Sequence, residues 1–268
     1  MKLHRHSRKF FAVFSSLWLA KASAAVGSWN VNAAGGWDNA SNWSGGTIPN
    51  GTGDTAHFSF DISAARAVSL NGDRTVGQLT IGDPTSSFFA YSIASGTPAS
   101  SRLIFDQTGT SAAFLNFPVV ANTAANTISA PILLMDSLEV TTAASNATNP
   151  TQTLSGIISD GASSYSITKK GLGLMTLSGV NAFDGGVTIE AGKLTASHNF
   201  ALGTGAATVS EGAQLFLNGI SGAYANALTI AGNGVALATN ETDSANLVGA
   251  LRYANATTSG SMAVSAGG

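Results

Sequence analysis

Short segments in which aliphatic residues occupy every second position run through the second half of the chain. Val187 and Ile189 flank Thr188, Leu215 and Leu217 flank Phe216, and the same alternation marks 228–230 and 235–237. Such a period of two places one set of side chains on a single face, which is typical of a half-buried strand. No helical period persists beyond residue 25, and glycine interrupts the chain about every ten residues. The pattern predicts an all-β protein.

These strand-like segments recur at a nearly constant interval. The segment 187–194 aligns with 207–215 and with 228–235, and each copy holds a strand, a glycine turn and a second strand. Three glycines lie 20 residues apart: Gly192, Gly212 and Gly232. Four β-branched residues are separated by 22, 20 and 21 positions: Ile167, Ile189, Val209 and Ile230. A repeat of this length with strands alone indicates one turn of a β-solenoid.

The interpretation favoured by this period is a β-solenoid, a coil of parallel strands. About 11 or 12 turns of about 21 residues would stack roughly 4.8 Å apart and bury equivalent aliphatic side chains in columns. A β-sandwich or an up-and-down barrel is the competing all-β architecture. Residues 84–125, which contain three prolines, are expected to carry loops.

Glycine and asparagine are the residues expected at the corners of the solenoid. Glycine supplies a positive φ at no steric cost. Asparagine can adopt the same conformation or form side-chain hydrogen bonds between successive turns. The candidates are Asn181, Asn218, Asn226 and Asn233.

Composition excludes several functional classes. The 268 residues contain no Cys, which rules out a disulfide framework, thiolate zinc sites and a Cys nucleophile. Only 10% of the residues are charged, and five of the 12 basic ones lie in the first 21 positions. The remainder has seven basic residues against 14 acidic ones, which argues against a nucleic-acid partner.

The N-terminal segment predicts export. A basic head precedes the mostly apolar run 10–20, and the small residues 22–25 follow. This order describes a secretory signal peptide at 1–24, cleaved after Ala24 or Ala25. An N-terminal membrane anchor is the alternative, although the run is shorter than the roughly 20 residues that a spanning helix needs. Beyond it we expect a Trp- and Gly-rich cap-like segment at 25–60 and the β-helix at 61–268.

The segment 171–194, GLGLMTLSGVNAFDGGVTIEAGKL, closely resembles the autotransporter-associated β-strand repeat. Met175 stands where that family usually has Leu. Segments 36–58 and 68–82 resemble those that often precede the repeat. The positions that carry the resemblance are Gly171, Gly173, Leu177, Gly179, Asn181, Gly185, Gly186, Thr188, Gly192 and Leu194.

The resemblance implies a non-enzymatic passenger-type protein, secreted or at the cell surface of a Gram-negative-type bacterium. It implies a right-handed parallel β-helix, no catalytic residue and no cofactor. The implied partners are the secretion machinery, namely the inner-membrane translocon and an outer-membrane barrel. Only 74 residues follow the best repeat, fewer than the about 80 that eight barrel strands need. We therefore expect a fragment, a truncated gene or a secreted stub.

Candidate catalytic residues are few. His57 and His198 have no carboxylate at a recognisable ligand spacing, so no metal site is predicted. Asp184-Gly185-Gly186 is a fragment of a calcium-binding β-roll motif, but it is not repeated. A polysaccharide-degrading β-helix enzyme would instead use clustered carboxylates. The candidate pairs are Asp136 with Glu139, Glu241 with Asp243, and Glu190 with Glu211, and ordinary solvated carboxylates are the competing interpretation.

Two tryptophans allow a ligand-binding alternative. Trp37 and Trp43, six residues apart among glycines, could present their rings to a surface glycan, as in an adhesin. Together with Trp29 they could instead cover the open N-terminal end of the solenoid, where apolar core and unpaired strand edges would otherwise face water. The cap is the favoured interpretation.

Overall fold

The computed structural model describes residues 23–85, 89–118, 124–143, 151–219, 224–234, 249–254 and 264–265. The signal-peptide prediction for 1–24 therefore lies almost wholly outside the described residues. The described part is nearly all β, with two short 3-10 turns, η1 (Ala40–Asn42) and η2 (Ser44–Gly46). Its strands form three sheets in which every strand pairing is parallel. This arrangement confirms the predicted parallel β-helix and excludes an antiparallel sandwich.

The first two sheets run the length of the molecule. The first contains, in pairing order, β1 (Val26–Ser28), β3 (Thr55–Phe58), β6 (Gln78–Ile81), β9 (Ala113–Phe117), β12 (Leu138–Thr142), β15 (Ile167–Lys170), β17 (Val187–Ile189), β19 (Ala207–Val209), β21 (Leu228–Ile230) and β23 (Val264–Ser265). The second contains β2 (Gly35–Gly36), β4 (Arg66–Ser69), β7 (Tyr91–Ala94), β10 (Thr127–Ile128), β13 (Gln152–Leu154), β16 (Leu174–Leu177), β18 (Gly192–Ala196), β20 (Ala213–Asn218) and β22 (Leu251–Ala254).

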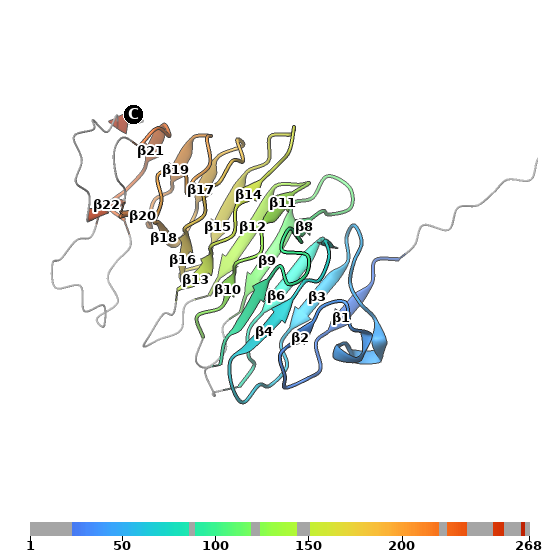
Figure 1. Ribbon diagram of the computed structural model, residues 1–268. Helices are drawn as coiled ribbons and strands as arrows, with labels where there is room; N and C mark the ends of the chain where they lie inside the picture. The colour runs from blue at the N-terminus through green and yellow to red at the C-terminus, as the bar shows by residue number, and fades with distance from the viewer. Residues whose placement is uncertain are drawn as a thin grey trace, which may run out of the picture.

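A third, four-stranded sheet was not predicted. It contains β5 (Arg74–Val76), β8 (Leu103–Phe105), β11 (Ile132–Leu134) and β14 (Ile158–Ser159). One full turn of the helix, here called a rung, has two strands in the first rung, three strands in each of the four rungs from β3 to β14, and two strands from β15 onward. Figure 1 shows the rungs stacked side by side from β1, in blue, to β22, in red.

Rung length confirms the predicted period only from β15 to β21, since the next step along the first sheet, from Leu228 to Val264, takes 36 residues. Val187 lies beside Ile167 after 20 residues and Ala207 beside Val187 after another 20, whereas the rung from Gln78 to Phe114 takes 36. The third strand and its loops lengthen the earlier rungs. The prediction of 11 or 12 uniform rungs was therefore wrong, since ten strands form the first sheet in the described residues. The long rung falls in 84–125, where loops were expected.

The register also corrects one alignment made from sequence. Ile189 pairs with Lys169, and Ile167 pairs with Val187. The alignment of Ile167 with Ile189 was therefore wrong by two positions. A strand shifted by two residues still directs the same set of side chains to the core, so the alternation alone cannot determine the register. The correction places Lys169 in the interior.

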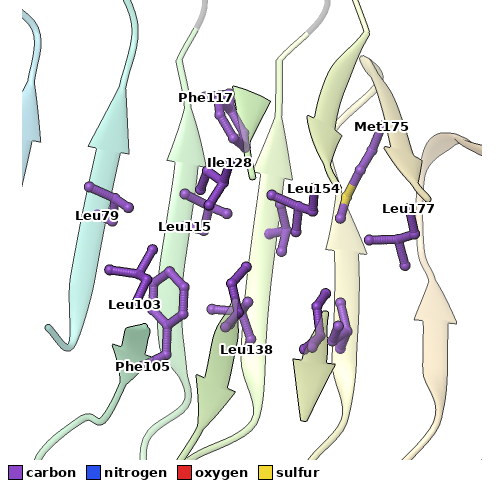
Figure 2. Close-up of a cluster of buried hydrophobic side chains, with 14 of the residues drawn as sticks. Leu79, Leu103, Phe105, Leu115, Phe117, Ile128, Leu138, Leu154, Met175 and Leu177 are labelled. Carbon is purple, nitrogen blue, oxygen red and sulfur yellow. The ribbon is translucent and has the colours of Figure 1, made fainter. Parts of the chain in front are cut away.

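The core consists of side-chain columns that run along the rod. Figure 2 shows Ile128, Leu154 and Leu177 of the second sheet in successive rungs, and Leu79 beside Leu115 of the first sheet. All five side chains are at most 1% exposed. Because each rung buries its apolar side chains against its neighbours alone, folding depends on contacts between adjacent rungs.

Candidate functional site

The glycines of the repeat motif lie where adjacent rungs approach each other most closely. A Cβ atom on Gly173 would lie 2.5 Å from the carbonyl oxygen of Ala143, and one on Gly179 would lie 2.5 Å from that of Gly156. A Cβ on Gly185 would overlap the backbone of Tyr165. Real Cβ atoms essentially never come this close to backbone atoms. These positions therefore have a packing reason to be glycine.

The corner between the first and second sheets is a glycine turn, as predicted. Gly192 has a φ of +67° there, and Gly171, Gly212 and Gly232 have φ values of +73°, +76° and +71° in the neighbouring rungs. An L-residue rarely adopts this conformation, and glycine adopts it freely. The 20-residue spacing of the glycines thus records where the chain turns.

Asn181 connects three successive rungs. Its side chain is 3% exposed, its Oδ1 accepts a hydrogen bond from Ile158 N at 2.9 Å, and its Nδ2 donates to the Ala201 carbonyl at 2.6 Å. The third sheet ends at β14, so this amide takes the place that a further strand would occupy. Asn226 acts similarly and donates to the Gly203 and Gly205 carbonyls at 3.1 and 2.7 Å.

The asparagine predictions are thus confirmed in part. The side-chain hydrogen bonds hold for Asn181 and Asn226. The positive φ does not: among the described residues Asn71, with a φ of 51°, is the one residue other than glycine in that conformation. None of the four predicted corner asparagines has a left-handed backbone, and Asn181 and Asn226 act through side-chain hydrogen bonds to neighbouring rungs.

Replacing Asn181 with Ala is expected to lower the free energy of unfolding by about 2 kcal/mol, because the Ile158 N–H and the Ala201 carbonyl lose their buried partner. Urea unfolding followed by circular dichroism measures this change. The exposed Asn233 provides a matched control, and Asn233→Ala should stay within about 0.5 kcal/mol of the parent protein. Equal effects of the two substitutions would contradict a bridging role for Asn181.

The remaining motif residues also face neighbouring rungs. Leu177 and Leu194 are fully buried. Thr188 lies half-buried on the outer face of the first sheet, in register with Thr168 and Thr208. Threonines stacked across parallel strands pack their β-branched side chains against one another and suit a pleated surface. The whole motif is thus accounted for by contacts between rungs.

Lys169 is a buried charge that the sequence interpretation missed. It occupies the interior column between Val140 and Ile189, and it is 0% exposed. Its ammonium Nζ donates to three backbone carbonyls, at 3.0 Å to Lys170, 2.6 Å to Gly171 and 3.0 Å to Ala191. The three donors of the ammonium are thereby satisfied at the glycine corner. The alternation of 167–170 could have revealed it, since Lys169 shares a face with Ile167.

Burial lowers the pKa of Lys169 to about 7, from an ordinary value of 10.5, although the three carbonyls favour the ammonium. Between these values the unfolded chain holds a proton that the folded chain has released. The free energy of unfolding is therefore expected to rise with pH from about 7 to about 10.5, by up to about 1.4 kcal/mol per unit. Unfolding by urea at several pH values, compared with Lys169→Met, measures the contribution. An identical pH dependence of the two proteins would contradict it.

The tryptophans form a closed cluster at the N-terminal end of the rod. Trp29, Trp37 and Trp43 are 2%, 0% and 1% exposed, and their rings lie 5.1–5.3 Å from the ring of Phe58. The indole nitrogens of Trp37 and Trp43 donate to the carbonyls of Pro49 and Trp37. Neither ring face is open to a glycan, so the suggested glycan contact at Trp37 and Trp43 does not agree with their burial. The geometry is that of a cap.

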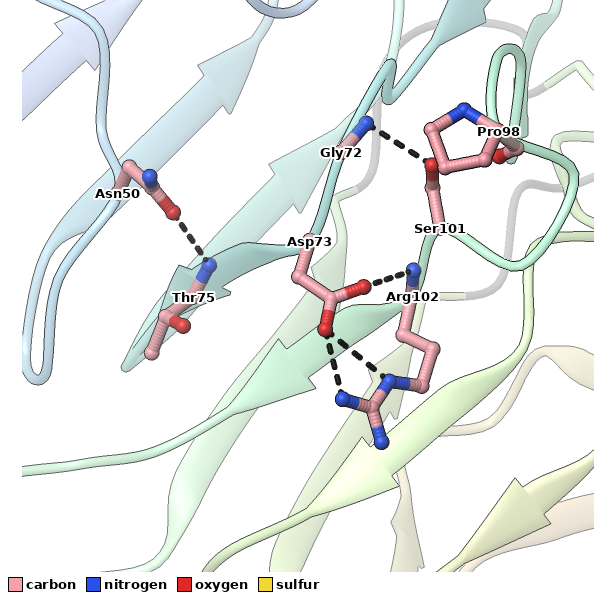
Figure 3. Close-up of polar contacts among 7 residues, drawn as sticks. All are labelled: Asn50, Gly72, Asp73, Thr75, Pro98, Ser101 and Arg102. Atoms are coloured by element: carbon pink, nitrogen blue, oxygen red, sulfur yellow. Dashed lines mark hydrogen bonds and ion pairs between the residues drawn. The ribbon is translucent and has the colours of Figure 1, made fainter.

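Polar side chains join the loops of the irregular N-terminal rungs (Figure 3). Asp73 accepts from the Arg102 backbone at 2.8 Å and from the Arg102 guanidinium at 2.7 and 3.1 Å. The hydrogen bonds from this guanidinium lower the pKa of the Asp73 carboxyl. Asn50 Oδ1 accepts from Thr75 N at 2.9 Å and thus satisfies a donor on β5, the edge strand of the third sheet. Side chains complete the pairing where the third sheet ends.

Two of the candidate catalytic carboxylates, Glu139 and Glu190, lie beside the ammonium group of Lys170. Asp136 accepts from Gln107 N at 2.7 Å, while Lys170 Nζ lies 2.9 Å from Glu139 and 4.0 Å from Glu190. The register sets Glu190 beside Ser210, so the predicted stacking of Glu190 on Glu211 is out of step by one residue. The pair Glu241 and Asp243 lies outside the described residues.

The two histidines are far apart in the fold. His57 lies on β3, and His198 Nδ1 accepts from Phe200 N at 3.1 Å. In the described part of the chain, no group of three or more His, Asp or Glu side chains is placed to hold a metal ion. No helix among the described residues has the length and hydropathy needed to cross a membrane.

Comparison with known proteins adds no assignment. No known protein family, curated protein or solved structure gives a significant match to this chain.

Proposed function

We propose that this protein is an exported, non-enzymatic structural β-helix that acts as an autotransporter-type passenger and supports secretion and display at the cell surface. One observation carries the proposal: the repeat residues that prompted the resemblance contact neighbouring rungs. Gly173, Gly179, Asn181 and Gly185 all face backbone of an adjacent rung. Chemistry on a substrate would require side chains directed at a ligand, whereas these residues contact the rod itself.

The mechanism follows from nearest-neighbour stacking. A rung that has folded offers an open row of strand N–H and carbonyl groups and an apolar column to the next rung. A chain that emerges from a translocon and a barrel can add rungs to the folded part in turn. Each rung added outside the cell disfavours backward movement of the chain. The secretion machinery is the partner that this proposal requires.

Export is tested by expressing the full chain in a Gram-negative bacterium and fractionating the cells. We expect the chain outside the cytoplasm, beginning at Ala25 or Val26 by N-terminal sequencing. Deletion of residues 1–24 is the matched control and should retain the protein in the cytoplasm. An unprocessed chain that folds in the cytoplasm would contradict the proposal.

The structural role is tested by comparing variants of the rod and of the carboxylates. Asn181→Ala should reduce the amount of exported, protease-resistant protein, whereas Asp136→Asn and Glu139→Gln should leave it nearly unchanged. A polysaccharide-cleaving activity that is lost in the carboxylate variants would instead identify an enzyme.

A further inference from the structure

Two carboxylates meet where the chain leaves two adjacent strands of the first sheet. β3 and β6 pair through Phe58 and Ile81, and Asp61 and Asp83 follow these strands by three and two residues. The hydroxyl oxygen of Thr85 lies 3.0 Å from Asp61 Oδ1 and 2.9 Å from Asp83 Oδ1. The stacking of rungs thus brings together two acidic residues that are 22 positions apart in the sequence.

The carboxylate oxygens of Asp61 and Asp83 share a single hydroxyl as hydrogen-bond donor. The Thr85 hydroxyl carries one hydrogen and can donate it to only one of the two carboxylates. Asp83 Oδ1 also accepts from Thr85 N at 2.9 Å, but Asp83 Oδ2 is buried and has no hydrogen-bond partner. The Asp83 residue as a whole is 3% exposed. A buried carboxylate oxygen that lacks a partner costs several kcal/mol unless a counter-charge is present.

Other buried aspartates are satisfied. Asp54, 8% exposed, accepts from Ala25 N at 2.6 Å with one oxygen and from Asn50 N at 2.9 Å with the other. Asp160, 5% exposed, accepts from two backbone N–H groups. Within the described ranges, Asp83 Oδ2 is the one buried carboxylate oxygen without a partner. The orphan oxygen is therefore a property of this corner and not of buried aspartates in this fold.

Among the described residues, no side chain forms an ion pair with Asp61 or Asp83. The nearby guanidinium of Arg66 binds Asn32 Oδ1 at 3.0 and 2.6 Å and forms no ion pair with either carboxylate. The hydroxyl of Tyr91 donates to the Phe60 carbonyl, so its one hydrogen is not available to Asp83. The described residues thus provide no positive charge as a partner for the buried Oδ2 oxygen of Asp83.

We propose that Asp61, Asp83 and Thr85 bind a calcium ion between the second and third rungs. Calcium binds anionic carboxylate oxygens and neutral oxygen ligands in flexible geometry, and water can fill the remaining positions. Asp61 is exposed, which leaves a path for the ion and for those waters, while Asp83 supplies the buried negative charge. The ion would fasten two rungs beside the N-terminal cap. The site is independent of the proposed export role.

The test compares thermal unfolding of the full chain after treatment with chelator and after addition of about 5 mM calcium. We expect calcium to raise the unfolding midpoint by about 5 °C. Asp83→Asn should abolish this shift and, in calcium-free buffer, should unfold at a higher midpoint than the parent protein because the unpaired charge is gone. Asp73→Asn, which changes a carboxylate paired with Arg102, is the matched control and should keep the calcium shift.

A second variant separates a ligand from a merely structural residue. Asp61→Asn changes an exposed side chain and should weaken calcium binding at least tenfold in a calorimetric titration. The proposal is overturned if calcium leaves the midpoint of the parent protein unchanged, or if the shift persists in Asp83→Asn. An equal shift with magnesium would overturn the assignment to calcium.

Discussion

Replacing Gly186 with Ala is expected to lower the free energy of unfolding by about 3 kcal/mol or more. Two independent penalties meet at this position. Gly186 has a φ of +83°, which costs an L-residue about 1–2 kcal/mol. A Cβ atom there would also overlap the carbonyl oxygen of Ala206, which accepts the hydrogen bond from Val187 N. The next rung would have to move away, and the pairing of β17 with β19 would be lost with it.

Gly212→Ala is the matched control, because it separates the two penalties. Gly212 has a similar φ of +76°, but a Cβ atom there would meet nothing within 4 Å. The control should therefore lose only the conformational term, about 1 kcal/mol. Urea unfolding of both variants measures the difference. If Gly186→Ala were no worse than Gly212→Ala, close approach of the rungs would not be the reason for this glycine.

The regular half of the β-helix could be predicted from sequence because its period is visible there. The corner glycines, the alternation and the buried pair Leu194 and Leu215 repeat at 20–21 residues, so a single rung describes several. The N-terminal half could not be predicted in this way. Its rungs contain a third strand and loops of different lengths. The rung from Gln78 to Phe114 takes 36 residues, so no constant repeat length is visible in this part of the sequence.

Side-chain contacts between rungs also could not be predicted from the spacing of residues in the sequence. The partners of Asn181 lie 23 and 20 residues away, and the pairing of Lys169 with Ile189 was masked by a register shift of two. No metal-binding sequence motif contains the spacing of Asp61 and Asp83, because it is the stacking of rungs that brings these two residues together. Side chains of this kind become visible only once the register of every rung is fixed.

Phe58→Ala is expected to open the N-terminal cap and to lower stability by about 3–5 kcal/mol. Phe58 is fully buried, and four aromatic rings surround it at centroid distances of 5.1–5.6 Å: Trp29, Trp37, Trp43 and Tyr91. Loss of this ring leaves a cavity at the centre of the cluster and removes every one of these contacts. Because rungs contact only their neighbours, the damage should begin in the first two rungs.

The three tryptophans make this localisation measurable. In a chain that starts at Ala25 they are the only tryptophans present, so indole fluorescence reports on the cap, whereas circular dichroism reports on all the sheets. In Phe58→Ala the fluorescence transition should precede the dichroism transition as urea increases. Phe200→Ala, which truncates a ring that is 49% exposed, is the control and should leave both transitions nearly unchanged. Coincident transitions with an unchanged midpoint in Phe58→Ala would show that the aromatic cluster does not hold the end of the rod.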